Sequence, residues 1–285
     1  MLAELVRVTT SDQCRLDGAW YAAPAGTTHP SGVDACLFLH GVAGNFYAGN
    51  LFDYLVNELV PQGTSCLRVN TRGHDSVCVA WGKSGTQFQG AAYEIVDQCR
   101  FDVRAWVEWL VERGARHIVL LGHSLGAIKA IYSQAYDPHP AVSGVVACSA
   151  PRLSYAAFMN SDAQPRFFES VTAAREQLQR GQPEMLILSK FPAAVWMTAA
   201  GYLDKYGPDE RYNILRFIDR LTCPLLATYG ELELSSGGIA FAGMHEAVVD
   251  ARRDGQRVET AVVAGADHAY TGVYDRLYGA LAGFL

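Results

Sequence analysis

The sequence predicts an α/β fold in which helices flank a mostly parallel central sheet, and three observations support this prediction. Half of the 285 residues are apolar and only 18% are charged, which is enough apolar material for one large core. Short apolar runs of β-forming residues recur along the chain. Helical segments separate these runs, and this alternation is typical of parallel strands covered on both faces.

The expected sheet begins with an antiparallel pair and continues with parallel strands. Residues 5–9 and 14–21 flank the turn-forming residues Ser11 and Asp12, which predicts the antiparallel pair. The apolar runs that predict parallel strands are 33–39, 64–70, 116–121, 142–148, 224–230 and 257–263.

A helix is expected between the second and third of these runs. Its apolar residues recur at steps of three and four, and Gly114 follows the last of them as a helix-ending residue. This stripe should pack on the sheet. Its members are Ile95, Cys99, Val103, Trp106, Val107 and Leu110.

Residues 152–222 interrupt the alternation of strands and helices. About 70 residues separate two expected strands here, whereas a crossover usually needs about a dozen. The segment has helical character and more aromatic residues than a small core needs. We interpret 152–222 as a helical cap inserted after the sixth strand, and 1–151 with 223–285 as one core domain. The alternative is that the aromatic rings only attach the insert to the core.

The charge pattern of the chain argues against several classes of function. A net charge of −6 leaves no basic surface for nucleic acid. No apolar run reaches the eighteen or so residues of a membrane-spanning helix, and the first ten residues lack the pattern of a signal peptide. The seven cysteines are odd in number and not closely paired, which is typical of free thiols in a reducing compartment. We therefore expect a soluble cytoplasmic protein that binds neither nucleic acid nor membrane.

The strongest motif is Gly122-His123-Ser124-Leu125-Gly126, which stands between an expected strand and an expected helix. A Gly-x-Ser-x-Gly pattern at such a turn is typical of a nucleophile elbow. The serine has unfavourable backbone angles there, and the two glycines let the strand and the helix pass closely. The hydroxyl is left exposed above the sheet, facing the N–H groups at the start of the helix. We therefore predict that Ser124 is a nucleophile.

Four further segments agree in order with a known superfamily. His40-Gly41-Val42 ends the first parallel run, and Arg72-Gly73-His74-Asp75-Ser76 follows the second. Glu233 stands three residues after Gly230, and Gly265-Ala266-Asp267-His268 lies near the end of the chain. With the elbow, these segments resemble the α/β-hydrolase superfamily over nearly the whole chain apart from 152–222. The sequence departs from the superfamily at Asp75, where glycine is usual.

The resemblance implies the α/β-hydrolase fold and a catalytic triad of Ser124, Glu233 and His268 in the order nucleophile, acid and base. His268 would take the proton of the Ser124 hydroxyl and return it to the leaving group. Glu233 would fix the tautomer of the imidazole and stabilise its charged form.

The oxyanion hole and the identity of the acid are two further features of the expected site. The resemblance implies that the backbone N–H groups of Val42 and Leu125 hold the oxyanion. Glu231 is an alternative acid if the loop after its strand turns differently. Asp267 is a weaker candidate, because an aspartate in a tight turn often accepts hydrogen bonds from its own backbone.

No metal or cofactor motif occurs in the sequence, so we expect none to be required. Cys148 could suggest thiol chemistry, but it is expected to be buried. The leading hypothesis is a serine hydrolase that cleaves a carboxylic ester or related acyl bond of a small apolar or mixed-polarity substrate through a Ser124 acyl-enzyme. The alternatives are a thioesterase or acyltransferase with the same triad, and a non-catalytic ligand-binding member of the fold.

Overall fold

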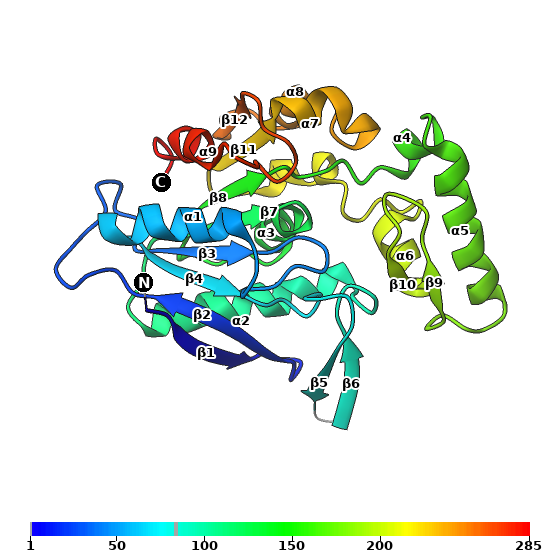
Figure 1. The fold of residues 1–285 in the computed structure, drawn as a ribbon, viewed down its shortest axis with the longest axis horizontal. Helices are drawn as coiled ribbons and strands as arrows, with labels where there is room; N and C mark the ends of the chain where they lie inside the picture. The colour runs from blue at the N-terminus through cyan, green and yellow to red at the C-terminus, as the bar shows by residue number, and fades with distance from the viewer. Residues whose placement is uncertain (1, 83–84) are drawn as a thin grey trace.

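A computed structural model describes residues 2–82 and 85–285 of the protein (Figure 1). Its strands are β1 (Glu4–Thr9), β2 (Arg15–Tyr21), β3 (Ala35–Leu39), β4 (Ser65–Val69), β5 (Cys78–Gly82), β6 (Gly85–Gln89), β7 (Ile118–His123), β8 (Val142–Cys148), β9 (Leu186–Leu188), β10 (Trp196–Thr198), β11 (Leu225–Gly230) and β12 (Val258–Val263). Its α-helices are α1 (Asn50–Leu59), α2 (Cys99–Glu112), α3 (Leu125–Tyr136), α4 (Tyr155–Met159), α5 (Gln164–Gln179), α6 (Ala199–Tyr206), α7 (Glu231–Ser236), α8 (Met244–Asp250) and α9 (Tyr274–Leu281).

The main sheet has eight strands in the order β1-β2-β4-β3-β7-β8-β11-β12. β1 and β2 pair antiparallel, and β2 also runs antiparallel to β4. All the other pairs in this sheet are parallel. The expected antiparallel pair and the six expected parallel strands are therefore present, with each boundary within two residues of its expected place.

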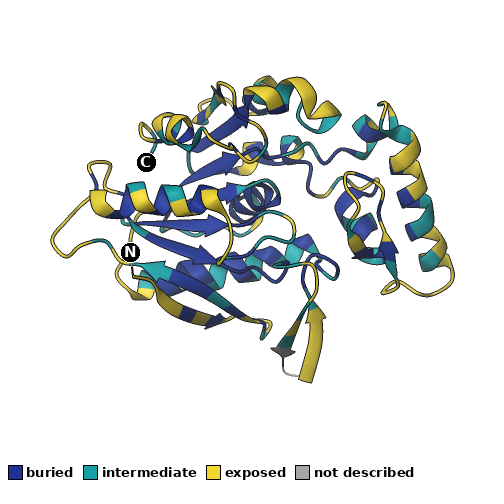
Figure 2. Ribbon diagram, viewed as in Figure 1, coloured by how far each residue is buried: buried dark blue, intermediate teal, exposed yellow. Residues whose placement is uncertain are grey.

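Helices cover both faces of the sheet (Figure 1). The central strand β3 is therefore apolar and buried along its whole length, whereas the edge strand β12 is partly exposed. In β3, Leu37 and Leu39 belong to the core under α2 and α3. The alternating residues Cys36 and Phe38 belong to the core under α1 and α9. The buried interior of the strands and the exposed outer faces of the helices are visible in Figure 2.

The expected helix after the second parallel strand begins later than its apolar stripe. Ile95 has extended backbone angles, and residues Val96–Gln98 form a 3-10 turn. α2 begins at Cys99, and Trp106 on its inner face is fully buried. The apolar period therefore predicted the buried face of the helix correctly. It did not predict the first helical residue, because the 3-10 turn before Cys99 continues the same period.

Residues 152–222, called the insert below, lie between β8 and β11 and beyond the carboxyl ends of the parallel strands, at the right of Figure 1. Most of their aromatic side chains are buried. Phe158, Phe167 and Phe191 pack on one another, with ring centroids 4.7 to 5.3 Å apart. Tyr212 packs against Tyr132 of α3. These buried rings form a core within the insert and its contact with α3, whereas Phe168 and Trp196 remain exposed.

Two short hairpins were not expected from the sequence. β5 pairs with β6 and β9 with β10, both outside the main sheet. Their strands are short, and the exposed β6 has no continuous apolar run. Strands of this kind lack the pattern by which the main sheet was recognised.

Candidate active site

Ser124 occupies the turn between β7 and α3 with φ 56° and ψ −122°. Two glycines make this turn possible. A Cβ atom on Gly122 would lie 2.1 Å from the Gly126 carbonyl oxygen, and one on Gly126 would lie 2.0 Å from the Leu39 carbonyl oxygen. The Ser124 N–H donates to the Cys148 carbonyl oxygen at 2.8 Å, which ties the turn to β8. The local geometry is the strained strand-to-helix turn that the motif predicts.

The structure brings Ser124, His268 and Glu233 together from distant parts of the chain. Ser124 Oγ lies 3.1 Å from His268 Nε2. The other ring nitrogen, Nδ1, is hydrogen-bonded to the Glu233 carboxylate. The His268 side chain is 43% exposed and that of Glu233 is 1% exposed. A half-exposed imidazole thus stands between a hydroxyl and a buried carboxylate, an arrangement suited to proton transfer.

The setting of Glu233 contains two residues that the sequence did not single out. Glu233 lies in the first turn of α7, where its carboxylate accepts the Gly230 N–H at 3.3 Å. The Ser149 hydroxyl donates to the same carboxylate at 2.8 Å and lies 3.0 Å from the Tyr270 hydroxyl. Ser149 directly follows β8. Its position at the carboxyl end of a parallel strand is the sequence feature that could have identified it as a site residue.

The two alternative acids bind backbone donors instead of His268. The Glu231 carboxylate accepts the Gly265 N–H at 2.8 Å. The Asp267 carboxylate accepts the N–H groups of Ala269 and Thr271 at 3.0 and 2.9 Å. These backbone hydrogen bonds lower the pKa of Asp267. Among the three carboxylates considered, the structure places only Glu233 against the imidazole.

His123 holds His268 in place through a hydrogen bond and a ring contact. Its Nε2–H donates to the His268 carbonyl oxygen at 2.7 Å, and the two ring centroids are 4.9 Å apart. Burial, together with the neighbouring His268, lowers the pKa of His123 to about 4. His123 is therefore neutral near pH 7. The centroid of the Phe241 ring lies 5.2 Å from that of the His268 ring.

Two backbone N–H groups are available for an oxyanion. The loop 40–49 passes directly beside Ser124, because a Cβ atom on Gly41 would lie 3.1 Å from the Ser124 Cβ atom. Within the described residues, the N–H of Val42 has no hydrogen-bond acceptor. Leu125 is the first residue of α3, where backbone N–H groups have no partner inside the helix.

His40 holds the beginning of the 40–49 loop. Its Nε2 accepts the Thr71 N–H at 3.1 Å, and its Nδ1–H donates to the Gly41 carbonyl oxygen at 2.8 Å. Burial, with a smaller effect from the Lys129 charge, lowers the pKa of His40 to about 3. The imidazole is therefore a neutral structural link between two loops.

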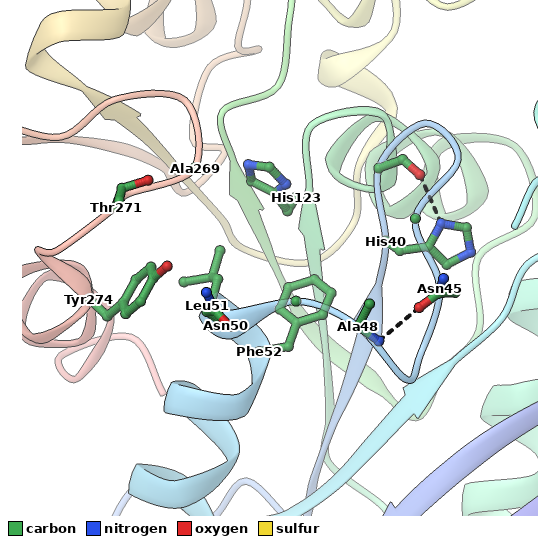
Figure 3. A pocket seen from close by; sticks show the side chains of 13 residues that line it. His40, Asn45, Ala48, Asn50, Leu51, Phe52, His123, Ala269, Thr271 and Tyr274 are labelled. Atoms are coloured by element: carbon green, nitrogen blue, oxygen red, sulfur yellow. Dashed lines mark hydrogen bonds between the residues drawn. The ribbon is translucent and has the colours of Figure 1, made fainter. Parts of the chain in front are cut away.

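A cavity of about 320 Å³ lies between the 40–49 loop, the start of α1 and the residues after His268 (Figure 3). The side chains at its wall include no Asp, Glu, Lys or Arg. Its lining combines apolar and neutral polar groups, among them Asn45, Leu51, Phe52, His123, Thr271 and Tyr274. The cavity therefore favours an uncharged group.

In the described part of the chain, no group of three or more His, Cys, Asp or Glu side chains is placed to hold a metal ion. Nor is any described helix long and apolar enough to cross a membrane. Cys148 is fully buried, and burial raises the pKa of its thiol to about 12.

A family model described as the alpha/beta hydrolase family matches residues 36–284. Several solved structures are similar in fold. The alpha/beta hydrolase GrgF from Penicillium sp. sh18 is 15% identical, with a TM-score of 0.68 and coverage of 99% of this chain and 97% of that chain. Est1E from Butyrivibrio proteoclasticus, bound to ferulic acid, is 16% identical, with a TM-score of 0.65 and coverage of 98% and 97%. The Pyrococcus furiosus esterase PF2001 is 19% identical, with a TM-score of 0.60 and coverage of 99% and 89%. No curated protein matches the sequence.

Proposed function

Because the chain belongs to the alpha/beta hydrolase family, we propose that it is a serine hydrolase that cleaves a carboxylic ester of a small uncharged substrate. The observation that carries this proposal is the alignment of Ser124 Oγ, the His268 ring and the buried Glu233 carboxylate. A protein that only binds ligands has no need of this alignment.

The proposed reaction has two steps that use the same groups. His268 Nε2 takes the Ser124 proton while the oxygen attacks the ester carbonyl, and the resulting imidazolium returns that proton to the departing alcohol. Water then attacks the acyl-enzyme in the same way, giving the acid and free Ser124. Glu233 stabilises the imidazolium in both steps. The N–H groups of Val42 and Leu125 hold the developing oxyanion.

The cavity beside the 40–49 loop supports a small neutral molecule as the substrate. The cavity of about 320 Å³ beside Gly41 and His123 is the size of a small ligand pocket and has no charged lining side chain. The insert, which we propose to be a cap over the core domain formed by 1–151 and 223–285, stands at the same end of the sheet. The proposed substrate is therefore an ester whose acid or alcohol part is short or contains a single ring.

A fluorophosphonate probe and an ester panel test this function directly. We expect one probe molecule to attach to Ser124 of the wild-type protein, no attachment to folded Ser124→Ala, and at least 10³-fold slower attachment to His268→Ala. The panel contains nitrophenyl esters of increasing chain length, methyl ferulate and a matched thioester. Absence of both labelling and turnover in folded wild-type protein would refute the hydrolase function. Faster turnover of the thioester than of the matched ester would show that the substrate is a thioester.

A further inference from the structure

Asp75 occupies the position at which the sequence departs from the superfamily pattern. Its φ of 55° lies in the left-handed region, which favours glycine. A side chain other than hydrogen is strained at this position. The contacts of the carboxylate show what it contributes there.

Three side chains donate hydrogen bonds to the Asp75 carboxylate. Asn45 Nδ2 lies 2.8 Å from Oδ1, the Tyr47 hydroxyl lies 2.5 Å from Oδ2, and His74 Nδ1 lies 2.8 Å from Oδ2. In addition, the backbone N–H of Asp75 donates to the Gly44 carbonyl oxygen at 3.0 Å. Three of these four contacts reach the 40–49 loop immediately after Val42.

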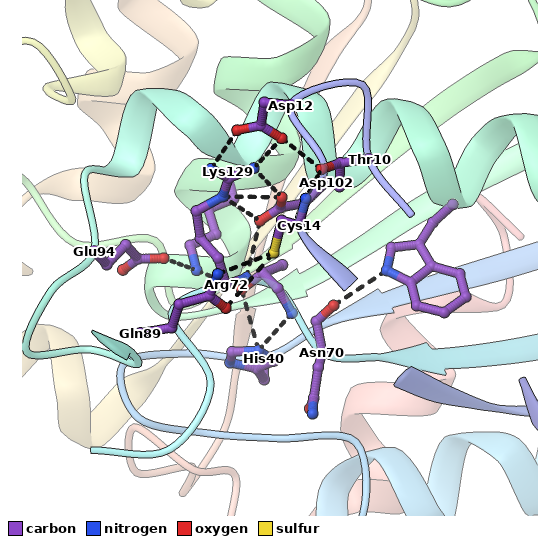
Figure 4. A network of polar contacts seen from close by, with 12 residues as sticks. Thr10, Asp12, Cys14, His40, Asn70, Arg72, Gln89, Glu94, Asp102 and Lys129 are labelled. Carbon is purple, nitrogen blue, oxygen red and sulfur yellow. Dashed lines mark hydrogen bonds and ion pairs between the residues drawn. The ribbon is translucent and has the colours of Figure 1, made fainter. Parts of the chain in front are cut away.

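The 40–49 loop is also held by hydrogen bonds that do not involve Asp75. At its start, the loop is tied to Thr71 through His40, whose side chain is labelled in Figure 4. In its second half, the Phe46 N–H donates to the Asn70 side-chain oxygen at 3.0 Å. Asn45 itself accepts the Ala48 N–H at 2.8 Å (Figure 3), so its side chain links Asp75 to the start of the cavity wall.

We propose that Asp75 is a positioning residue that holds the 40–49 loop in the shape required to aim the Val42 N–H at the oxyanion. The inference rests on the proposed hydrolase function. Asp75 does not touch the reacting atoms. It acts through Asn45, Tyr47 and the Gly44 carbonyl, and the left-handed backbone is tolerated because these contacts offset its strain.

The variant Asp75→Gly separates positioning from general stability. Glycine removes the carboxylate contacts and also relieves the strained φ. We expect kcat to fall about 10- to 100-fold, below the loss of about 10² to 10³ for deleting an oxyanion donor, with KM changed less than threefold. The melting temperature should stay unchanged or rise. Asp75→Asn, which can still accept hydrogen bonds, should recover part of kcat.

A matched control is Gln13→Gly. Gln13 also has a left-handed φ, of 70°, but lies in the turn between β1 and β2 and has no side-chain hydrogen bond within the described residues. It should leave kcat unchanged. A similar fall in kcat for this variant would assign the effect to altered turns in general and overturn the role of Asp75.

Backbone hydrogen exchange of residues 41–48 provides a readout that needs no substrate. We expect it to accelerate at least tenfold in Asp75→Gly at unchanged melting temperature, and the rate of fluorophosphonate labelling to fall by the same factor as kcat/KM. Unchanged exchange and unchanged kcat would overturn the positioning role. An inactive wild-type protein would instead overturn the hydrolase function and the catalytic part of this proposal, whereas exchange would still test the anchor itself.

Discussion

The carboxylates of Glu233 and Glu94 are equally buried but have different hydrogen-bond and ion-pair partners. The side chain of each is 1% exposed. Glu233 is hydrogen-bonded to His268, which faces solvent and can exchange protons. Glu94 lies between Lys129 and Lys205, whose ammonium groups are 2.5 and 3.4 Å from its oxygens and are themselves enclosed. The partner, not the burial of the carboxylate, distinguishes the proposed active site from a structural ion pair.

The Glu94 cluster joins α3 to α6. Lys129 belongs to α3, whereas Lys205 belongs to α6 of the insert. Burial alone would raise the pKa of Glu94, but the two lysines bring it down to about 2. The neighbouring Arg72 pairs with Asp102 and Asp12 (Figure 4). The lowered pKa of Glu94 therefore reflects an ion pair that connects two parts of the molecule.

The largest expected effect is that of Glu233→Gln. A neutral amide cannot stabilise the imidazolium and can hold the wrong tautomer, so kcat should fall on the order of 10³ to 10⁴, while the melting temperature changes little. Steady-state ester hydrolysis measures the loss. The matched control is Glu231→Gln, which removes only a contact to the Gly265 N–H and should change kcat less than threefold. The reverse ranking would transfer the acid role to Glu231.

The next expected effect concerns Glu94→Gln, which leaves two buried ammonium groups without a counter-charge. Breaking a buried ion pair in this way should lower the free energy of unfolding by about 3 to 5 kcal/mol. Urea unfolding measures this loss, and kcat per folded molecule should change less than fivefold.

The double variant Glu94→Gln/Lys129→Met serves as the control for this prediction. It removes one of the two uncompensated charges and should recover part of the stability. Loss of activity in Glu94→Gln at unchanged stability would contradict the structural assignment of this carboxylate.

The smallest expected effect comes from His40, which links the proposed oxyanion loop to the Glu94 cluster through Thr71 and Lys129. Its pKa is about 3 in the folded protein and about 6.5 when unfolded. Between these values the unfolded chain binds the extra proton, so stability is full above pH 6.5 and falls as the pH is lowered. At pH 4.5 this residue alone should cost about 2 to 3 kcal/mol.

Urea unfolding at pH 7 and pH 4.5 tests this pH dependence. The loss of stability on acidification should be smaller in His40→Gln than in the wild-type protein by about the amount attributed to His40. His117→Gln, at an exposed surface position, is the control and should show the wild-type loss. Equal losses in all three proteins would show that His40 is free to take up a proton in the folded state.

The sequence by itself determined the parts of this protein that depend on neighbouring residues. The apolar runs located the parallel strands, and the glycines around Ser124 predicted a turn in which a Cβ atom would overlap the backbone. The order of Ser124, Glu233 and His268 was also readable, because each follows a strand of recognisable pattern.

Only the tertiary structure decided which side chains meet across those elements. The choice of Glu233 over Glu231 depends on the turn into α7 and on Ser149 of a different strand end. The contacts of Asp75 with the 40–49 loop, and of Glu94 with a lysine of the insert, join segments about 30 and 110 residues apart. Such pairings arise when distant segments pack together, and no periodicity or local propensity along the chain encodes them.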